Sequence, residues 1–464
     1  MSISPSSFDV LVDLERGSDM VYQGAFPSTS IGSAVRTLTR DIQGDVILLG
    51  HPEYDQARRV FNGAIRRTPY AVIRPRGVAD VVTAVRYARD NDLPLTVRGG
   101  GHHVAGHSVV DGGVTIDLSL MRSVYVDAER RIAVVEGGAL WSDVDRATQP
   151  YGLATPGGTV ASVGVGGFTL GGGIGRLSRA RGLAADNLVS VDIVTADGRC
   201  VTASEDENES LFWAIRGGGG NLGVVTSFEF RLHEVGPEVW SGAIVYAIED
   251  APRVLRAVRD LMVSSSDELN VSPAIVRQQG RPVLVVNPFW VGDPAAGCSA
   301  VRSLRDAATP IIDAYGPTSY FALQSVDAPG GRRSWESSAF LDQLFDATID
   351  ALVAYAADAP INAPRIALLP LGGAMARVPG SSTAFGGREA AWLVQAGGAW
   401  DDASEDGAAR AWIERVHEAV SGDASGIAYV NMLADQRPAH SAWTRARLRA
   451  VKATWDPENL FRSR

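Results

Sequence analysis

The chain has 464 residues, of which 45% are hydrophobic and 21% charged, and its formal net charge is −10. This length exceeds the usual size of a single domain and predicts two domains with separate cores. The negative charge argues against nucleic acid or an anionic membrane as the main partner.

The sequence shows no signature of export or membrane insertion. Met1–Ser7 has no basic segment followed by an apolar run, and no apolar segment of about 18 residues occurs later. The two cysteines, Cys200 and Cys298, are widely separated, which favours reduced thiols over a disulfide framework. We therefore expect a soluble, cytoplasmic protein that is a monomer or a homodimer.

The first part of the chain predicts alternating helices and strands. Residues 1–44 are weakly periodic and predict an irregular leader or a helix on the surface. A helix over Tyr54–Asn62, a strand over Ala71–Ile73, a helix over Val78–Asp90 and a strand over Leu95–Arg98 follow in order. This alternation predicts an α+β unit whose last strand leads into a loop.

That loop is rich in glycine. Gly99, Gly100 and Gly101 lead directly into His102 and His103. Because glycine has no Cβ, the loop can turn tightly and bring consecutive N–H groups against a ligand. Such a loop suits a pyrophosphate, and the adjacent imidazole can then reach a ring system attached to that pyrophosphate.

A second glycine-rich stretch runs from Gly157 to Gly175. Before it, the sequence predicts strands over Val114–Ser119 and Ile132–Val135 and a helix over Trp141–Gln149 that Ser142 caps. The stretch holds too much glycine for an ordinary helix or strand interior, where each glycine costs about 0.5–1 kcal/mol relative to alanine. Large apolar residues are interleaved with the glycines, which argues against a flexible linker. Close approach of the backbone to a ligand is the better explanation.

A third glycine-rich stretch, Arg216–Gly223, has the spacing G-x-G-x-x-G. It follows a predicted hairpin with Asp197-Gly198 at its turn and a predicted helix over Glu209–Ile215. The stretch leads from a helix into a strand, which is the reverse of the turn that binds dinucleotides in a Rossmann fold. NAD is therefore not implied, and the three loops together predict another large cofactor that carries phosphate groups.

From about Trp240 the composition changes and predicts a second domain, an antiparallel sheet with helices on one face. The chain end, Trp443–Phe461, predicts a helix that Asp456-Pro457 terminates and that returns to the first domain. The other elements expected here are strands over Trp240–Tyr246, Pro282–Trp290, Arg365–Leu371 and Ala391–Gln395, and helices from Asp250 and over Ala295–Ala307, Ser337–Ala357 and Gly407–Val420.

Together these motifs resemble the FAD-linked oxidases of the berberine-bridge-enzyme-like branch, in the vanillyl-alcohol-oxidase or PCMH-type FAD-binding family. The resemblance extends from about Asp45 to Arg462. It implies an α+β fold with a two-subdomain FAD-binding domain over 45–239, a substrate-binding domain over 240–437, and a segment over 438–464 that returns to the FAD-binding domain. The motifs that carry the resemblance are Arg98–His102, Val163–Gly167, Asp186-Asn187, Phe212–Gly223, Gly372–Arg377, Tyr429–Asn431 and Asp456–Phe461.

In the family that the chain resembles, a ring nitrogen of the histidine in the first loop is bonded to the flavin 8α carbon. This implies a covalent bond between FAD and His102, with His103 as the alternative. Many relatives have a second bond from a cysteine, but Val160 stands at that place, so we expect a single link. The histidines could instead suggest zinc, but no convincing fourth ligand is present and no metal is expected. The residues expected to bind FAD are Arg98, Gly99, Gly100, Gly101, His102, His103, Val104, Gly106, His107, Ser108, Gly157, Gly158, Thr159, Val160, Ser162, Val163, Gly166, Gly167, Asn221, Gly223, Val224, Val225, Tyr429 and Asn431.

The resemblance also implies that a substrate C–H gives a hydride to flavin N5 and that O2 reoxidises the flavin. Tyr429 is the candidate acceptor of the accompanying proton, and Asn431, on the same face of an expected strand, would hydrogen-bond substrate or flavin. Some relatives have a catalytic carboxylate before Gly372, but Ile366–Leu371 offers none. Four further residues fit either a substrate pocket or ordinary packing, namely Tyr320, Trp290, Gln395 and Arg365.

The sequence thus predicts an FAD-dependent oxidase. Its expected partners are O2 and a small or medium organic substrate, oxidised at an alcohol, amine or activated C–H group, as in secondary metabolism. The alternatives are a flavin dehydrogenase that reacts poorly with O2 and a flavin-binding protein without turnover.

Overall fold

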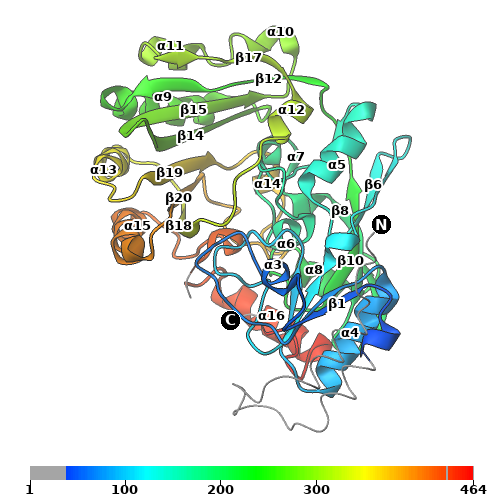
Figure 1. Ribbon diagram of the computed structural model, residues 1–464. Helices are drawn as coiled ribbons and strands as arrows, with labels where there is room; N and C mark the ends of the chain where they lie inside the picture. The colour runs from blue at the N-terminus through cyan, green and yellow to red at the C-terminus, as the bar shows by residue number, and fades with distance from the viewer. Residues whose placement is uncertain (1–37, 435–436, 463–464) are drawn as a thin grey trace, which may run out of the picture.

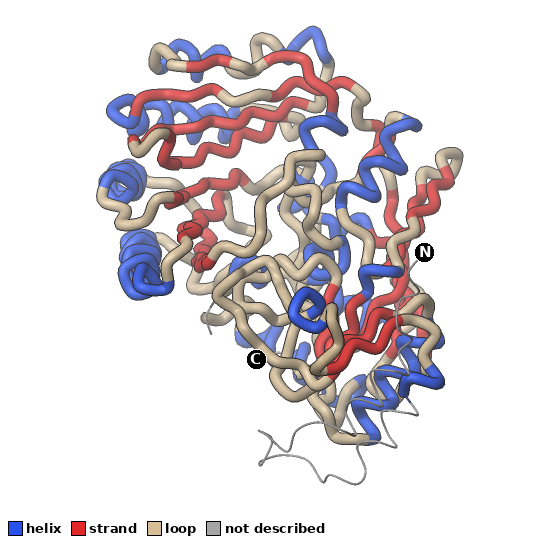
Figure 2. Tube along the Cα trace, viewed as in Figure 1, coloured by secondary structure: helices blue, strands red, loops and turns tan. Residues whose placement is uncertain are grey.

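The computed structural model describes residues 38–434 and 437–462 (Figure 1). Most of the expected leader, residues 1–37, lies outside the described part. Figure 2 shows the strands in two groups, with a central region made mostly of loops and short helices between them. The glycine-rich stretches belong to this central region.

The first sheet has four strands in the order β1-β2-β4-β3. Strands β2 and β3 both pair in parallel with β4, and helix α4 (Val78–Asp90) connects β2 to β3, with the bounds that its apolar periodicity predicts. The expected helix over Tyr54–Asn62 is shorter, since α3 covers only Tyr54–Ala57. The strands are β1 (Asp45–Leu48), β2 (Ala71–Arg74), β3 (Leu95–Arg98) and β4 (Val114–Asp117).

The second sheet has five antiparallel strands in the order β5-β6-β10-β8-β9. The predicted hairpin is confirmed, because β8 pairs with β9 and Gly198 in their turn has a φ of +76°. Apolar residues of α5 (Trp141–Thr148) and α8 (Glu209–Ile215) share a core with this sheet. The strands are β5 (Val124–Asp127), β6 (Ile132–Glu136), β8 (Leu188–Val194), β9 (Cys200–Ser204) and β10 (Val224–Arg231).

One predicted helix cap is wrong. Ser142 lies inside the first turn of α5, and Leu140 is the residue at its N-cap. The Leu140 N–H donates to the Asp143 carboxylate at 2.9 Å. The side chain of the third helical residue therefore provides the hydrogen-bond acceptor for the N–H group at the N-cap.

The third sheet has nine strands and begins at β12, where the composition changes. Its main path is β16-β13-β15-β14-β19-β20-β18, and β12 pairs with β15 and β17. Helices α9 (Ala251–Ser264), α13 (Asp346–Ala357) and α15 (Asp406–Ser421) lie along one side of it in Figure 1 and share its largest apolar core. The strands are β12 (Glu238–Ser241), β13 (Ile244–Ala247), β14 (Leu269–Gln278), β15 (Arg281–Trp290), β16 (Ile312–Asp313), β17 (Gly316–Ser319), β18 (Arg333–Leu341), β19 (Ala363–Pro370) and β20 (Trp392–Trp400).

Three element predictions in this sheet are wrong. The expected helix over Ser337–Ala357 is strand β18 followed by α13, because nine consecutive residues of β18 pair with β20. The expected strand over Trp240–Tyr246 breaks into β12 and β13 at Gly242, whose φ is +142°. The expected helix over Ala295–Ala307 is split into α10 (Pro294–Gly297) and α11 (Arg302–Ala307).

The C-terminal helix α16 (Ala442–Trp455) packs on α8 in the first half of the chain. Phe461 forms a parallel bridge with Leu95 at the edge of the first sheet. The ammonium of Lys452 donates to the carbonyl oxygens of Asn221 and Phe461 at 2.6 and 2.7 Å, which joins this segment to the third glycine loop.

The remaining elements are short and lie mostly in the central region. Within the described residues, no helix combines the length and the apolar character that crossing a bilayer requires. The short elements are β7 (Leu153–Ala154), paired with β11 (His233–Glu234), and the helices α6 (Val165–Leu170), α7 (Ser178–Arg181), α12 (Tyr320–Gln324) and α14 (Ala374–Arg377).

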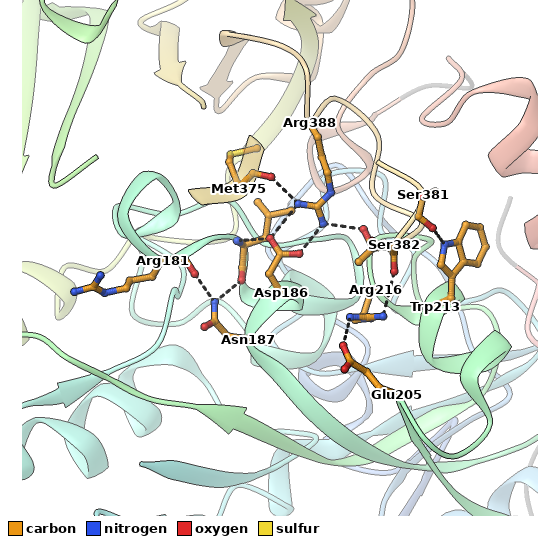
Figure 3. Close-up of polar contacts among 12 residues, drawn as sticks. Arg181, Asp186, Asn187, Glu205, Trp213, Arg216, Met375, Ser381, Ser382 and Arg388 are labelled. Carbon is orange, nitrogen blue, oxygen red and sulfur yellow. Dashed lines mark hydrogen bonds and ion pairs between the residues drawn. The ribbon is translucent and has the colours of Figure 1, made fainter. Parts of the chain in front are cut away.

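A buried ion pair joins the two groups of strands (Figure 3). Asp186, which precedes β8, accepts two hydrogen bonds from the Arg388 guanidinium at 2.6 and 3.0 Å. Arg388 also donates to the carbonyl of Met375 and the hydroxyl of Thr383, both at 2.8 Å. The side chains of Arg388 and Asp186 are only 3% and 7% exposed, so this pair is shielded from water on both sides.

Candidate active site

A cavity of about 840 Å³ opens between the three glycine loops and the third sheet. Its volume is in the range of cofactor and ligand sites. Nineteen of the residues that the sequence assigns to the cofactor line it, namely Gly99, Gly100, Gly101, His102, His103, Val104, His107, Ser108, Gly158, Thr159, Val160, Val163, Gly166, Gly167, Asn221, Gly223, Val225, Tyr429 and Asn431.

The first two glycine loops touch each other as well as the cavity. A Cβ built on Gly100 would lie 2.3 Å from the Gly164 nitrogen, so only glycine allows the two backbones to come this close. Gly167 and Gly219 line the cavity differently, because a Cβ on either would have no atom within 4 Å. Side chains at these two positions would therefore project into open space.

The second stretch contains a short helix despite its glycine content. Helix α6 includes Gly166 and Gly167, where the sequence predicts no ordinary helix. Gly171, just after α6, leaves room for the Asn431 amide, whose oxygen would lie 1.9 Å from an added Cβ. Packing against the last part of the chain explains the local glycine content here.

His102 projects from the first loop and stacks on Phe61, with ring centroids 4.4 Å apart. Its Nε2 lies 3.0 Å from the Ser162 hydroxyl oxygen, and this hydroxyl donates in turn to the Asp327 carboxylate. Burial lowers the pKa of His102, and the Asp327 charge opposes this only in part, so the imidazole is neutral at pH 7. No described residue is bonded to its Nδ1.

His103 is held by the protein at both ring nitrogens. Nε2 is 3.0 Å from the Val430 carbonyl oxygen, and Nδ1 accepts a hydrogen bond from the Ala105 N–H at 3.2 Å. A carbonyl only accepts, so Nε2 carries the proton. His103 thus has no ring nitrogen available, whereas His102 has one.

Three of the predicted cofactor residues do not line the cavity, because they lie behind the lining and support it. The Arg98 guanidinium donates to Asp117 at 2.5 Å and to two carbonyl groups of the chain. Gly106 sits against Ile65, which would lie 2.7 Å from an added Cβ. Val224 is completely buried in the core of the first sheet.

Two further predicted residues, Gly157 and Ser162, also lie outside the cavity lining. Gly157 packs against the Trp141 ring, which would lie 2.5 Å from an added Cβ. Ser162 reaches the site through its hydrogen bond with His102. Sequence motifs identify these five positions but cannot separate residues that face the cavity from residues that support it.

Tyr429 and Asn431 meet in space, although the expected strand is absent. Tyr429 precedes a 3-10 turn over Val430–Met432, and the Asn431 amide donates to the Tyr429 hydroxyl oxygen at 2.9 Å. The backbone N–H groups of Gly173 and Ile174 donate to the same oxygen at 3.2 and 3.1 Å. Burial raises the pKa of Tyr429 despite these three donors, so the phenol stays protonated at neutral pH.

The third sheet contributes polar side chains to the opposite wall. Gln395 and Arg365 line the cavity, whereas Tyr320 and Trp290 do not. Tyr320 is buried against Phe289, and the Trp290 indole donates to the Asp293 carbonyl. The sequence did not indicate Glu336, the only carboxylate among the described lining residues, because the residues that follow it were expected to form a helix and strand β18 was not predicted.

The described lining of the cavity holds neither a cluster of metal ligands nor a thiol. Among the residues that the structure describes, no group of three or more His, Cys, Asp or Glu side chains could hold a metal ion. Cys200 and Cys298 are exposed thiols, and neither lines the cavity.

Comparison with known proteins agrees with this geometry. Residues 69–204 match a family model described as an FAD binding domain, and residues 428–464 match one described as berberine and berberine like. An uncharacterized FAD-linked oxidoreductase of Bacillus subtilis is 30% identical over 91% of this chain and 96% of its own length.

Two solved structures are similar over nearly the whole chain. The 6-hydroxy-D-nicotine oxidase of Arthrobacter nicotinovorans has a TM-score of 0.82 and 27% identity, covering 91% of this chain and 97% of its own. The glucooligosaccharide oxidase of Acremonium strictum, whose FAD is described as 6-S-cysteinyl and 8α-N1-histidyl, has a TM-score of 0.83 and 23% identity, covering 92% and 98%. The chain therefore belongs to the FAD-linked oxidoreductases, in their berberine-bridge-enzyme-like branch with a PCMH-type FAD-binding fold.

Proposed function

We propose that this protein is an FAD-dependent oxidase that removes two electrons from a small or medium organic molecule, with O2 as the acceptor. The observation that carries the proposal is a neutral imidazole, His102, with a free Nδ1 at the edge of a cavity lined by three glycine loops. In domain terms, we assign residues 45–239 and 438–464 to FAD binding and residues 240–437 to substrate binding.

The residues of the cavity fit FAD. Gly167 and Gly219 leave space that any larger residue would fill. The Ser108 hydroxyl and His440 Nδ1 are buried lining atoms without a hydrogen-bond partner among the described residues, as expected of atoms that bond to a ligand. Arg445 and Arg449 also line the cavity and complement the negative phosphates.

Bound FAD would supply the redox chemistry, by accepting a hydride from the substrate and passing two electrons to O2. We propose that Tyr429 and Asn431 hold the second glycine loop in place through the bonds to Gly173, Ile174 and Phe168. The raised pKa of the Tyr429 phenol makes it a weaker candidate for the catalytic base than its motif suggests.

The proton positions around His102 favour Nδ1 as the atom that bonds to the flavin. Asp327 is ionised, because the hydrogen bond from Ser162 lowers its pKa, and an ionised carboxylate can only accept. The single Ser162 hydroxyl proton therefore points to Asp327, and the Ser162 oxygen accepts from His102 Nε2. A neutral imidazole that carries its proton on Nε2 has its lone pair on Nδ1.

Replacing Asp327 by alanine should slow covalent attachment of the flavin without abolishing flavin binding. Loss of the acceptor frees the Ser162 proton, which can then point to His102 and allow the tautomer with its proton on Nδ1. A hydrogen bond of this kind contributes about 0.5–1.5 kcal/mol, which corresponds to a change of roughly 2- to 10-fold in rate. The measurement is the time course of acid-stable flavin after FAD is added to flavin-free protein. Asp260→Ala, which removes an exposed carboxylate on α9, is the matched control, and equal rates for both variants would contradict the tautomer argument.

Replacing Gly167 by alanine should lower flavin loading without lowering stability. The added methyl group projects into the cavity, and overpacking costs about 1–3 kcal/mol, which corresponds to roughly 5- to 150-fold weaker binding. The ratio of flavin to protein absorbance reports the loading, and thermal unfolding of the flavin-free protein reports the stability. Gly407→Ala, at an exposed position of α15 with no atom within 4 Å of an added Cβ, should keep full loading. Full loading of Gly167→Ala would show that FAD does not occupy this part of the cavity.

The proposed activity is tested by anaerobic mixing of the purified protein with a panel of alcohols, amines and sugars. A substrate bleaches the flavin absorbance, and admission of air restores it quickly in an oxidase. A colourless protein, or one that no compound bleaches, contradicts the proposal. Bleaching followed by slow reoxidation in air would replace the oxidase with a dehydrogenase.

A further inference from the structure

The cavity wall formed by the third sheet carries two opposite charges at defined places. In the strand register, Arg365 of β19 and Glu336 of β18 are both paired with Gly397 of β20. Residues directly opposite one another on adjacent strands have side chains on the same face. Arg365 and Glu336 therefore share the face that lines the cavity. Gly397, which has no side chain, lies between them.

Gly397 keeps the space between the two charges open. A Cβ at this position would lie 3.0 Å from the Glu336 Cβ, closer than most real contacts, and a larger side chain would fill the gap above the sheet. Gln395, two residues along β20 and on the same face, donates its amide to one Glu336 oxygen at 2.5 Å. The other carboxylate oxygen of Glu336 has no hydrogen-bond partner among the described residues.

Arg365 is an exposed residue that lines the cavity and has no partner among the described residues. Its guanidinium makes no hydrogen bond, and no ion pair within 4.0 Å, with any described residue. The cavity wall partly removes Arg365 from bulk water, which lowers its pKa, and the nearby Glu336 charge opposes this shift. A guanidinium offers five N–H donors, so the unpartnered Arg365 on the cavity wall can bind the acceptor atoms of a ligand.

Mutual neutralisation alone does not explain this arrangement. Two side chains that served only to balance each other would gain most from a direct bidentate ion pair, as Arg388 forms with Asp186. Here the donors of Arg365 and one oxygen of Glu336 remain open to the cavity, on the wall that faces the glycine loops.

We propose that Arg365 and Glu336 form a two-point substrate site, in which Arg365 binds an anionic oxygen and Glu336 binds a hydroxyl or amino group of the same molecule. The substrate class is then an organic acid, or an acidic phenol, that also carries an alcohol or amine. This inference rests on the proposed oxidase function. During oxidation of the alcohol or amine, Glu336 would accept the O–H or N–H proton, and bound FAD would accept the hydride from carbon. O2 would then take up the two electrons and two protons and leave as hydrogen peroxide.

The test measures binding and does not require the natural substrate. Benzoate supplies an anion, benzylamine supplies a cation and hydrogen-bond donors, and benzamide is the neutral control. Each is titrated against the flavin-loaded protein and followed by the change in flavin absorbance. The variants are Arg365→Met, which keeps the unbranched stem without the guanidinium, and Glu336→Gln, which keeps the side-chain length. Their flavin loading and melting temperature serve as checks of folding.

Each variant is expected to weaken the binding of one of the two ions and not of the other. Arg365→Met should weaken benzoate binding about tenfold or more, since hydrogen bonds to charged groups are strong, and should leave benzylamine binding unchanged or tighter. Glu336→Gln should weaken benzylamine binding by a similar factor and leave benzoate binding unchanged or tighter. Benzamide binding should change little in either variant.

The proposal is overturned if the wild-type protein binds neither ion, or if both variants affect the two ions equally. These outcomes are distinct from failure of the oxidase proposal. A protein without flavin refutes that function directly, and ion binding to the flavin-free protein can then still be measured by calorimetry.

Discussion

Replacement of His102 by alanine is expected to abolish acid-stable flavin completely. The reason is that His102 has the only ring nitrogen of the two neighbouring histidines that the protein leaves unbonded, while both nitrogens of His103 are held by backbone groups. Val160 provides no thiol, and both cysteines lie away from the cavity. The wild-type protein should therefore carry one FAD per chain by intact mass, and the variant should have the mass of its polypeptide alone.

Two further histidine variants sharpen this result. His51→Ala removes a partly exposed imidazole outside the cavity and should retain the covalent flavin in full. His103→Asn should retain covalent flavin, because the hydrogen bond to the Val430 carbonyl belongs to the support of the loop. Acid-stable flavin in His102→Ala that disappears in His103→Asn would assign the attachment to His103 and refute the tautomer argument.

The buried pair of Arg388 and Asp186 gives the largest expected effect on stability. Arg388→Met leaves the Asp186 charge in a site that excludes water, and breaking a buried pair in this way costs about 3–5 kcal/mol. Asp186→Asn should cost a similar amount, because Arg388 then loses its charged partner. The melting temperature of each variant, measured with and without added FAD, checks the prediction.

A surface pair provides the comparison for this effect. Arg253 and Asp250 are also in contact, at 2.7 Å, but their side chains are 64% and 33% exposed. Solvent screens such pairs, so Arg253→Met should change stability by about 0–1 kcal/mol. If Arg388→Met were as mild as Arg253→Met, the pair shown in Figure 3 would not hold the loop between α14 and β20, which contains Arg388, to the segment before β8.

The local sequence was sufficient for elements whose formation depends on nearby residues. Helix α4 has the bounds that its apolar spacing predicts, and the Asp197-Gly198 turn forms where a two-residue hairpin signal occurs. Prediction failed where pairing between distant strands overrides helical periodicity. Residues 337–341 look helical in isolation, but they belong to β18 because β20, more than fifty residues later, supplies their hydrogen-bond partners.

The sequence by itself determined the class of cofactor and the loops that hold it, because glycine spacing and a neighbouring histidine are local signals. Only the tertiary structure decided which groups act on those loops. Asp327 reaches Ser162 across 165 positions of sequence, and Glu336 faces Arg365 across a strand that comes from later in the chain. These contacts exist because sheet register and loop packing bring distant residues together, and no local pattern encodes either.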